Sequence, residues 1–137
     1  MKFTRTVFFI AAIYGFLLLI PMYFLMHTIG EQAPPPISHP EFYYGFLGVT
    51  LLWQCIFVWI ALDPLRFQPI IPLAVLEKVA YTVPVLILYS TGRVQANILE
   101  TGLADPIFAI LFIAAYFRMS FLRVPRNIIG SEEARTS

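Results

Sequence analysis

The chain has 137 residues, of which 59% are hydrophobic and only 12% are charged, and its net charge is +1. A soluble domain carries about twice that share of charged residues, so the composition excludes an ordinary water-soluble globule and indicates an integral membrane protein. The near-neutral charge gives no electrostatic basis for binding nucleic acid. The single cysteine, Cys55, excludes an intrachain disulfide.

Four apolar stretches are long enough to cross a hydrocarbon core of about 30 Å, which takes roughly 20 helical residues. They predict an all-α fold, a four-helix transmembrane bundle. The expected helices cover residues 7–26, 42–62, 70–90 and 106–122. They form one membrane domain over residues 1–125, and residues 126–137 are expected to be a polar, frayed C-terminal tail.

The first apolar run follows the basic segment MKFTRT and is interrupted only by Pro21. It is longer than the hydrophobic region of a signal peptide, which has roughly 7–15 residues, and no small-residue cleavage site follows it. We therefore interpret it as a true first helix.

The helix at 42–62 has two distinct faces. One carries Gly45, Gly48 and Cys55, small residues that permit close packing against another helix of the bundle. The other carries Gln54, whose amide is costly against lipid and should meet either the first helix, near Tyr14, or another protein. The candidate partner interface on this second face comprises Tyr43, Thr50 and Gln54.

The helix at 70–90 carries adjacent charges, Glu77 and Lys78, in the middle of its apolar run. A charged side chain at the bilayer centre costs about 2.5–3.5 kcal/mol on insertion scales, so both should face the interior of the bundle. Adjacent helical residues point about 100° apart, which is a poor arrangement for pairing with each other. Each charge is therefore expected to have a partner on another helix.

We expect Glu77 to pair with Arg118, which enters the membrane at a similar depth on the fourth helix. Lys78 is then left for Asp63, for which Arg66 competes, or for water and carbonyl groups. The predicted polar network comprises Glu77, Lys78, Tyr81, Arg118, Asp63 and Arg66. It can hold the bundle together, bind a ligand or proton, or dock a partner subunit, since intramembrane charges commonly mark functional sites.

The basic residues outside the spans indicate the orientation. Six Lys and Arg side chains flank the two ends of the chain or the connection between the second and third helices, and only Arg93 lies on the opposite side. Because basic residues favour the cytoplasmic side, both termini are expected to be cytoplasmic.

No Ser-His-Asp, HExxH, GxGxxG or P-loop pattern is present, so an enzyme is not favoured and no cofactor is expected. His27 and His39 flank a Pro-rich outer loop and are too few to predict a metal site. An apolar position for Cys55 disfavours a reactive thiol.

The second helix opens with EFYYGFLG, and this segment, four short spans and two inner ends together resemble the DoxX-like group of small bacterial four-helix membrane proteins. The resemblance covers roughly residues 5–123. It implies a four-helix fold in the bacterial inner membrane and transfers no catalytic residue.

Two functions are compatible with these features. The first is an accessory or scaffold subunit that acts through a membrane-protein complex, favoured by the lack of catalytic motifs and by the face around Gln54. The alternative is a small binding or transport module for a lipid, quinone or proton that uses the Glu, Lys, Tyr and Arg cluster. The expected partners are the lipid bilayer and a membrane-protein complex or a second copy of the chain.

Overall fold

The computed structural model describes residues 1–32 and 35–133, with side chains up to Phe121 except Thr101. Within these residues the chain forms helices and no strand. The helices are α1 (Lys2–Met22), α2 (Met26–Gln32), α3 (Pro40–Leu62), α4 (Pro64–Phe67), the 3₁₀ helix η1 (Gln68–Ile70), α5 (Ile71–Ser90), α6 (Ala96–Gly102) and α7 (Ala104–Glu133).

Four segments of the described chain are long and apolar enough to cross a membrane, which confirms the predicted all-α, four-span architecture. These segments are Lys2–Met22, Pro40–Leu62, Pro64–Ser90 and Ala96–Phe121. The predicted ranges for the second and third spans agree with the structure to within a few residues.

The first span begins earlier and ends earlier than the predicted range of 7–26. Helix α1 ends at Met22, directly after Pro21, which has no N–H for the helical ladder. A turn follows, in which the Tyr23 N–H donates to the Ile20 carbonyl at 3.2 Å and the Phe24 N–H donates to the Pro21 carbonyl at 3.0 Å. A separate short helix, α2, follows this turn and precedes α3.

The fourth span consists of two helices instead of the single predicted helix at 106–122. Helix α6 ends where the Leu103 N–H donates to the Glu100 carbonyl, and α7 begins at Ala104. This break places Asp105 in the first turn of α7. At its other end α7 extends to Glu133, so residues 126–133 of the predicted tail are helical and residues 134–137 lie outside the described part.

A tight turn joins the second and third spans. The Asp63 side chain accepts a hydrogen bond from the Arg66 N–H at 3.3 Å, and Pro64 occupies the first position of α4. A side-chain acceptor at the N-cap followed by proline is a favourable start for a helix. The turn returns the chain across the membrane without a long loop.

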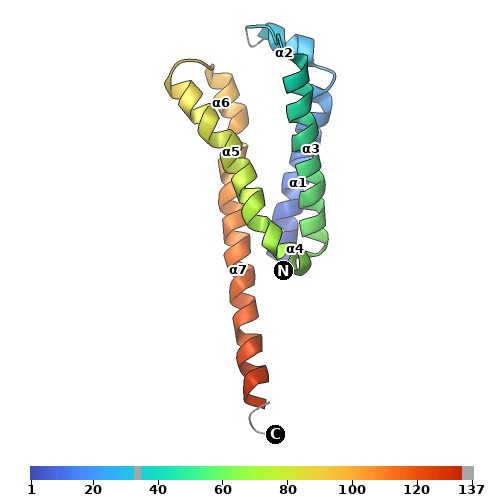
Figure 1. Ribbon diagram of the computed structural model, residues 1–137, viewed down its shortest axis with the longest axis vertical. Helices are drawn as coiled ribbons and strands as arrows, with labels where there is room; N and C mark the ends of the chain where they lie inside the picture. The colour runs from blue at the N-terminus through green and yellow to red at the C-terminus, as the bar shows by residue number, and fades with distance from the viewer. Residues whose placement is uncertain (33–34, 134–137) are drawn as a thin grey trace.

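The helices pack as two hairpins. Helix α1 lies along α3, and α5 lies along α7 with α6 beside it, as Figure 1 shows. The hairpins meet in a core near α4, in which the rings of Phe8 and Phe112 stack at 4.1 Å and Phe57 approaches Phe112 edge-on at 5.1 Å. Stacked and edge-to-face rings add to the stabilisation from apolar burial. This aromatic core fixes the α1 and α3 hairpin against α7.

The predicted packing face of the second helix is correct at Gly48, where an added Cβ would lie 3.4 Å from the Tyr23 hydroxyl, and wrong at Gly45 and Cys55. Nothing lies within 4 Å of a side chain built at Gly45, and Cys55 is exposed on the outer surface of the bundle. Helix α3 instead buries Phe57 and Ile60, which are fully enclosed. Burying two large apolar side chains removes more apolar surface than burying a stripe of small residues, so the larger face turns inward.

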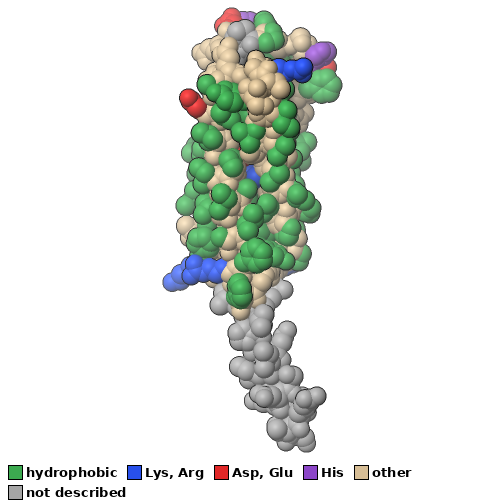
Figure 2. Space-filling model, turned by 90° about the vertical axis from the view of Figure 1, so that its left-hand side faces the viewer, with side chains coloured by type: hydrophobic (Ala, Val, Ile, Leu, Met, Phe, Trp, Pro, Cys, Tyr) green, Lys and Arg blue, Asp and Glu red, His purple; other side chains and the backbone are tan. Residues whose placement is uncertain are grey.

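Charged side chains gather at the two ends of the described bundle. Figure 2 shows Lys and Arg side chains at one end, acidic and His side chains with one basic side chain toward the other, and mainly hydrophobic side chains between them. The beginning of α1 and the final turns of α7 lie at the same end of the molecule (Figure 1). This distribution matches a bundle whose middle section faces hydrocarbon.

Candidate functional site

Lys78 lies close to the middle of the third span and is the centre of the candidate site. Its Nζ is 2.8 Å from Asp105 Oδ1 and 3.3 Å from Glu77 Oε2. The three side chains are largely enclosed, with exposed fractions of 8% for Lys78, 14% for Glu77 and 20% for Asp105. We call Lys78, Glu77 and Asp105 the Lys78 cluster.

The surroundings of the Lys78 cluster are apolar and aromatic. The ammonium lies 5.3 Å from the centre of the Phe57 ring on α3, a distance suited to a cation–π contact. One turn further along α5, the Thr82 hydroxyl donates to the Lys78 carbonyl at 2.9 Å. The cluster therefore joins α5 to α7, and the Phe57 ring brings α3 into contact with it.

The two carboxylates hold Lys78 unequally. Asp105 makes the short contact, whereas Glu77 Oε2 is at ion-pair distance and is buried without a hydrogen bond. With all three groups ionised, the cluster carries two negative charges and one positive charge. A surplus charge is strongly disfavoured in an apolar interior, where charge interactions are weakly screened.

The predicted partners of Glu77 and Lys78 are wrong. Glu77 lies next to Lys78 and not next to Arg118, and Lys78 contacts Asp105 and not Asp63. Both side chains are long and flexible, so they converge on the side facing α7 although their Cα–Cβ bonds diverge. The 100° angle between adjacent residues describes only the directions in which their side chains leave the helix.

The remaining charged members of the predicted network lie outside the cluster. Asp63 and Arg66 are exposed in the α4 turn, where the Arg66 guanidinium lies 5.6 Å from the Phe67 ring centre. Arg118 is exposed too, and its guanidinium lies 5.3 Å from the centre of the Phe3 ring. These residues serve the end of the bundle, where long basic side chains reach polar surroundings.

Tyr81 lies beside the cluster and connects three helices. Its ring stacks on Phe46 of α3 with a 5.8 Å separation of centres. A side-chain carbon built at Gly102 of α6 would lie 3.4 Å from the Tyr81 ring. Tyr81 thus packs between α3 and α6.

Of the predicted partner interface, Gln54 is buried inside the molecule, whereas Tyr43 and Thr50 are partly exposed. Gln54 is 1% exposed and packs against Gly15 of α1, where an added Cβ would overlap its amide. The Tyr43 hydroxyl donates to the Met22 carbonyl at 2.7 Å, and the Thr50 hydroxyl donates to the Phe46 carbonyl. The alternative prediction, that Gln54 meets the first helix, is correct, because α1 supplies a glycine where the amide needs room.

Two polar contacts of the structure are not predicted from the sequence. One involves Asp105, which lies just outside the expected helix at 106–122, although the segment LADP is a helix-start pattern with an acidic residue followed by proline. The other is a buried contact between Gln68 and Ser120, whose Nε2 and Oγ atoms are 3.1 Å apart. The two residues are 52 positions apart, and no periodic pattern connects them.

The histidines occupy separate places in the structure. His27 lies 3.3 Å from Glu31, and His39 lies 3.1 Å from Glu41. Among the described residues, no group of three His, Cys, Asp or Glu side chains could hold a metal ion. Each histidine is thus a local, exposed partner of one glutamate.

The fold and the Lys78 cluster define a polytopic helical membrane protein with an ion cluster inside its bundle. The chain matches no protein-family model, no curated protein and no solved structure.

Proposed function

We propose that this protein is a small membrane-embedded binding module that takes up a proton at the Lys78 cluster. The observation that supports it is the position of one ammonium between two carboxylates inside a membrane-spanning bundle. Intramembrane ionisable groups are costly, and proton relays are among the roles for which they are retained.

The charge of the cluster favours a proton over an anion or a neutral ligand. One added proton brings the three groups from a net charge of −1 to neutrality. Asp105 lies 2.8 Å from the Lys78 ammonium and Glu77 lies 3.3 Å from it, so the added proton goes to the Glu77 carboxylate, which has the longer contact. The charge-assisted Lys78–Asp105 contact persists in both states.

The space beside the cluster also favours a small ligand. A cavity of about 80 Å³ lies between α5, α6 and α7, with Thr82 and Pro106 among its lining residues. Sites for larger organic molecules have volumes of about 300–1,000 Å³. This cavity is too small for a quinone or a lipid head group, and its other lining residues are apolar side chains and a glycine.

The accessory-subunit function remains the second candidate. Its original support, the face around Gln54, is absent because Gln54 packs against α1. The exposed apolar surface of α3, which includes Leu52 and Trp59, offers a binding surface to another membrane protein of a complex. The DoxX-like resemblance supports a bacterial inner membrane, and the basic residues of the α1 and α4 end support cytoplasmic termini.

Infrared difference spectroscopy on the protein in lipid vesicles tests the proton site. Acidification should produce a carbonyl band of a protonated carboxylic acid, and Glu77→Gln should remove it. Glu41→Gln is the matched control, because Glu41 is exposed and far from the cluster. A Glu77→Gln spectrum identical to that of the unaltered protein contradicts the proposal.

Native mass spectrometry from mild detergent separates the two candidates. Stoichiometric recovery with larger membrane proteins supports the accessory subunit. If the protein is recovered without a partner and still shows the Glu77-dependent carbonyl band, the result supports the binding module.

A further inference from the structure

Basic side chains from two helices meet at the end of the bundle that contains α4 and the beginning of α1 (Figure 1). The Arg118 guanidinium of α7 lies 5.3 Å from the centre of the Phe3 ring in the first turn of α1. Lys2 and Arg5, on either side of Phe3 in the sequence, are exposed, and so is Arg118. We call Lys2, Arg5 and Arg118 the basic cluster.

No acidic side chain pairs with the basic cluster within the described residues. The first turn of α1 contains no Asp or Glu, and none of the ion pairs in this part of the chain includes Lys2, Arg5 or Arg118. The cluster therefore presents three positive charges at an exposed surface. Such a concentration of like charge attracts an anion, so the surface favours an anionic ligand over a neutral one.

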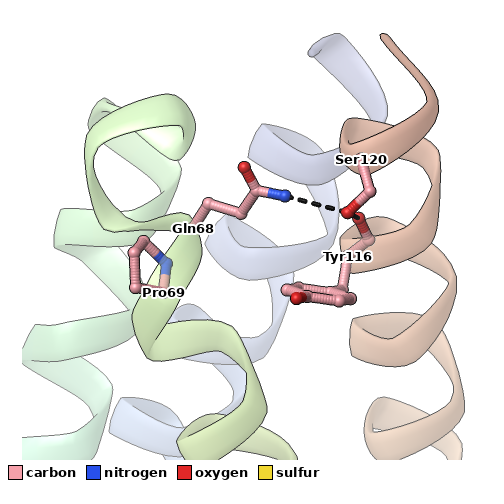
Figure 3. Close-up of a pocket in the computed structure, with 4 residues that line it drawn as sticks. All are labelled: Gln68, Pro69, Tyr116 and Ser120. Carbon is pink, nitrogen blue, oxygen red and sulfur yellow. Dashed lines mark hydrogen bonds between the residues drawn. The ribbon is translucent and has the colours of Figure 1, made fainter. Parts of the chain in front are cut away.

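The position of Arg118 suits a phosphate group. Its guanidinium lies over the Phe3 ring, a contact that orders the side chain, and its planar set of N–H donors matches two phosphate oxygens. Helix α7 is held in place here, because the Gln68 amide donates to the Ser120 hydroxyl at 3.1 Å (Figure 3). Ser120 and Arg118 leave the helix in nearly opposite directions, so this bond leaves Arg118 accessible.

The surroundings of Arg118 favour a lipid as the source of the phosphate. Arg118 lies in the last turn of the fourth span, which ends at Phe121, and this is the depth at which lipid head groups meet hydrocarbon. Phe117 and Phe121 beside it on α7 are exposed, and so is Ile10 on α1. A phospholipid can place its phosphate at Arg118 and its acyl chains against such apolar side chains. A free phosphate ion gains nothing from them.

We propose that the basic cluster binds the phosphate of an anionic phospholipid, with Arg118 as its principal contact. The charge of the cluster selects against a zwitterionic phospholipid, whose phosphate is accompanied by a cation that Lys2 and Arg5 repel. This site does not depend on the proton function, because it shares no residue with the Lys78 cluster.

Lipid titration followed by native mass spectrometry in mild detergent tests the proposal. The probes are dioleoylphosphatidylglycerol and dioleoylphosphatidylcholine, which have the same chains and a phosphate each but differ in net charge. The unaltered protein should bind the phosphatidylglycerol at least about five-fold more tightly, the effect of one basic side chain near an anionic head group. Equal binding of the two lipids overturns the proposal, and this comparison requires no variant protein.

Two variants locate the effect. Arg118→Met should weaken phosphatidylglycerol binding about five-fold and leave phosphatidylcholine binding unchanged. Arg66→Met is the matched control: Arg66 lies at the same end and over the Phe67 ring, but the Asp63 carboxylate is in the same turn and accepts its N–H. Phosphatidylglycerol binding that is unchanged in Arg118→Met, or that falls equally in both variants, overturns the assignment to this cluster.

A soluble competitor distinguishes a lipid from a free phosphate. Glycerol 3-phosphate carries a similar anionic group without acyl chains, so at the concentration of the lipid it should not displace bound phosphatidylglycerol. Displacement under these conditions would show that the cluster binds phosphate alone, and it would overturn the lipid assignment.

Discussion

The side chain of Lys78 illustrates how much a single buried charge depends on its neighbours. Its ammonium has Asp105 at 2.8 Å, Glu77 at 3.3 Å and the Phe57 ring on a third side. The apolar surroundings strengthen each of these contacts and also raise the cost of losing one. Removing one partner from a buried ion pair is typically unfavourable by about 3–5 kcal/mol, because the other partner remains as an uncompensated charge.

We expect Lys78→Met to destabilise the protein by about 3–5 kcal/mol, because two buried carboxylates then face each other without a cation. Reversible unfolding in mixed detergent micelles measures this free energy. Arg118→Met is the control. Arg118 is exposed and lies over Phe3, so its removal should cost about 1 kcal/mol or less. Equal losses for the two variants contradict a buried ion cluster.

At this scale the sequence predicts which residues are buried better than it predicts their contacts. The cost of a charge in hydrocarbon requires Glu77 and Lys78 to face inward, and both do. Their partners depend on the break before Ala104, which brings Asp105 down into the span. Hydropathy starts the expected helix at residue 106 and so leaves Asp105 outside the span, although it lies in the first turn of α7.

At the scale of helices, close contact between α1 and α3 depends on one missing side chain. Gly15 leaves the space that the Gln54 amide fills, and Gln54 is in turn held by its bond to the Thr50 carbonyl at 3.0 Å. Small residues that allow two backbones to approach are the common means of helix association in membranes. The contact therefore pairs a small residue on one helix with a polar one on the other.

Gly15→Ala should destabilise the α1–α3 contact by about 1–3 kcal/mol, because the added carbon overlaps the enclosed amide of Gln54. The unfolding free energy in micelles gives the value. Gly45→Ala on α3 is the matched control, because nothing lies within 4 Å of the added carbon, and it should leave the stability unchanged. A larger loss at Gly45 would show that α1 packs on the other face of α3.

The existence of the four spans follows from hydropathy, but their ends and faces do not. Pro21 carries a readable signal, the missing N–H, and α1 ends one residue after it. The face of α3 is ambiguous in the sequence, because apolar residues surround the helix and only packing against α1 selects the side with Phe57. Helices that are apolar all round leave little amphipathic pattern to interpret.

At the scale of the whole molecule, the outer surface is largely apolar along its middle section. Leu17 is 73% exposed, Leu52 is 65% exposed and Ile110 is 67% exposed, on three different helices. Such a surface is suited to lipid tails and unsuited to water. Either lipid or another membrane protein must cover it.

Cys55, on the exposed surface of α3, distinguishes lipid from protein cover. A nitroxide attached there should collide often with oxygen, which dissolves in lipid, and rarely with a water-soluble nickel chelate. Electron paramagnetic resonance in vesicles and in native membranes gives both collision rates. If the collision rates of both probes are low in native membranes but not in vesicles of the purified protein, another protein covers α3, which favours the accessory subunit.

The division of the bundle into two hairpins has a consequence for how the protein could be divided. Within the described residues, three polar side-chain contacts between helical segments each stay inside one half. Gln68 with Ser120 and Lys78 with Asp105 lie in the second half, and Tyr43 with Met22 lies in the first. The halves meet through rings, chiefly Phe8, Phe57 and Phe112. A chain cut in the α4 turn thus yields two fragments that each keep their own polar partners. Separately synthesised, they can reassemble in a bilayer through the apolar and aromatic core and the Lys78–Phe57 contact.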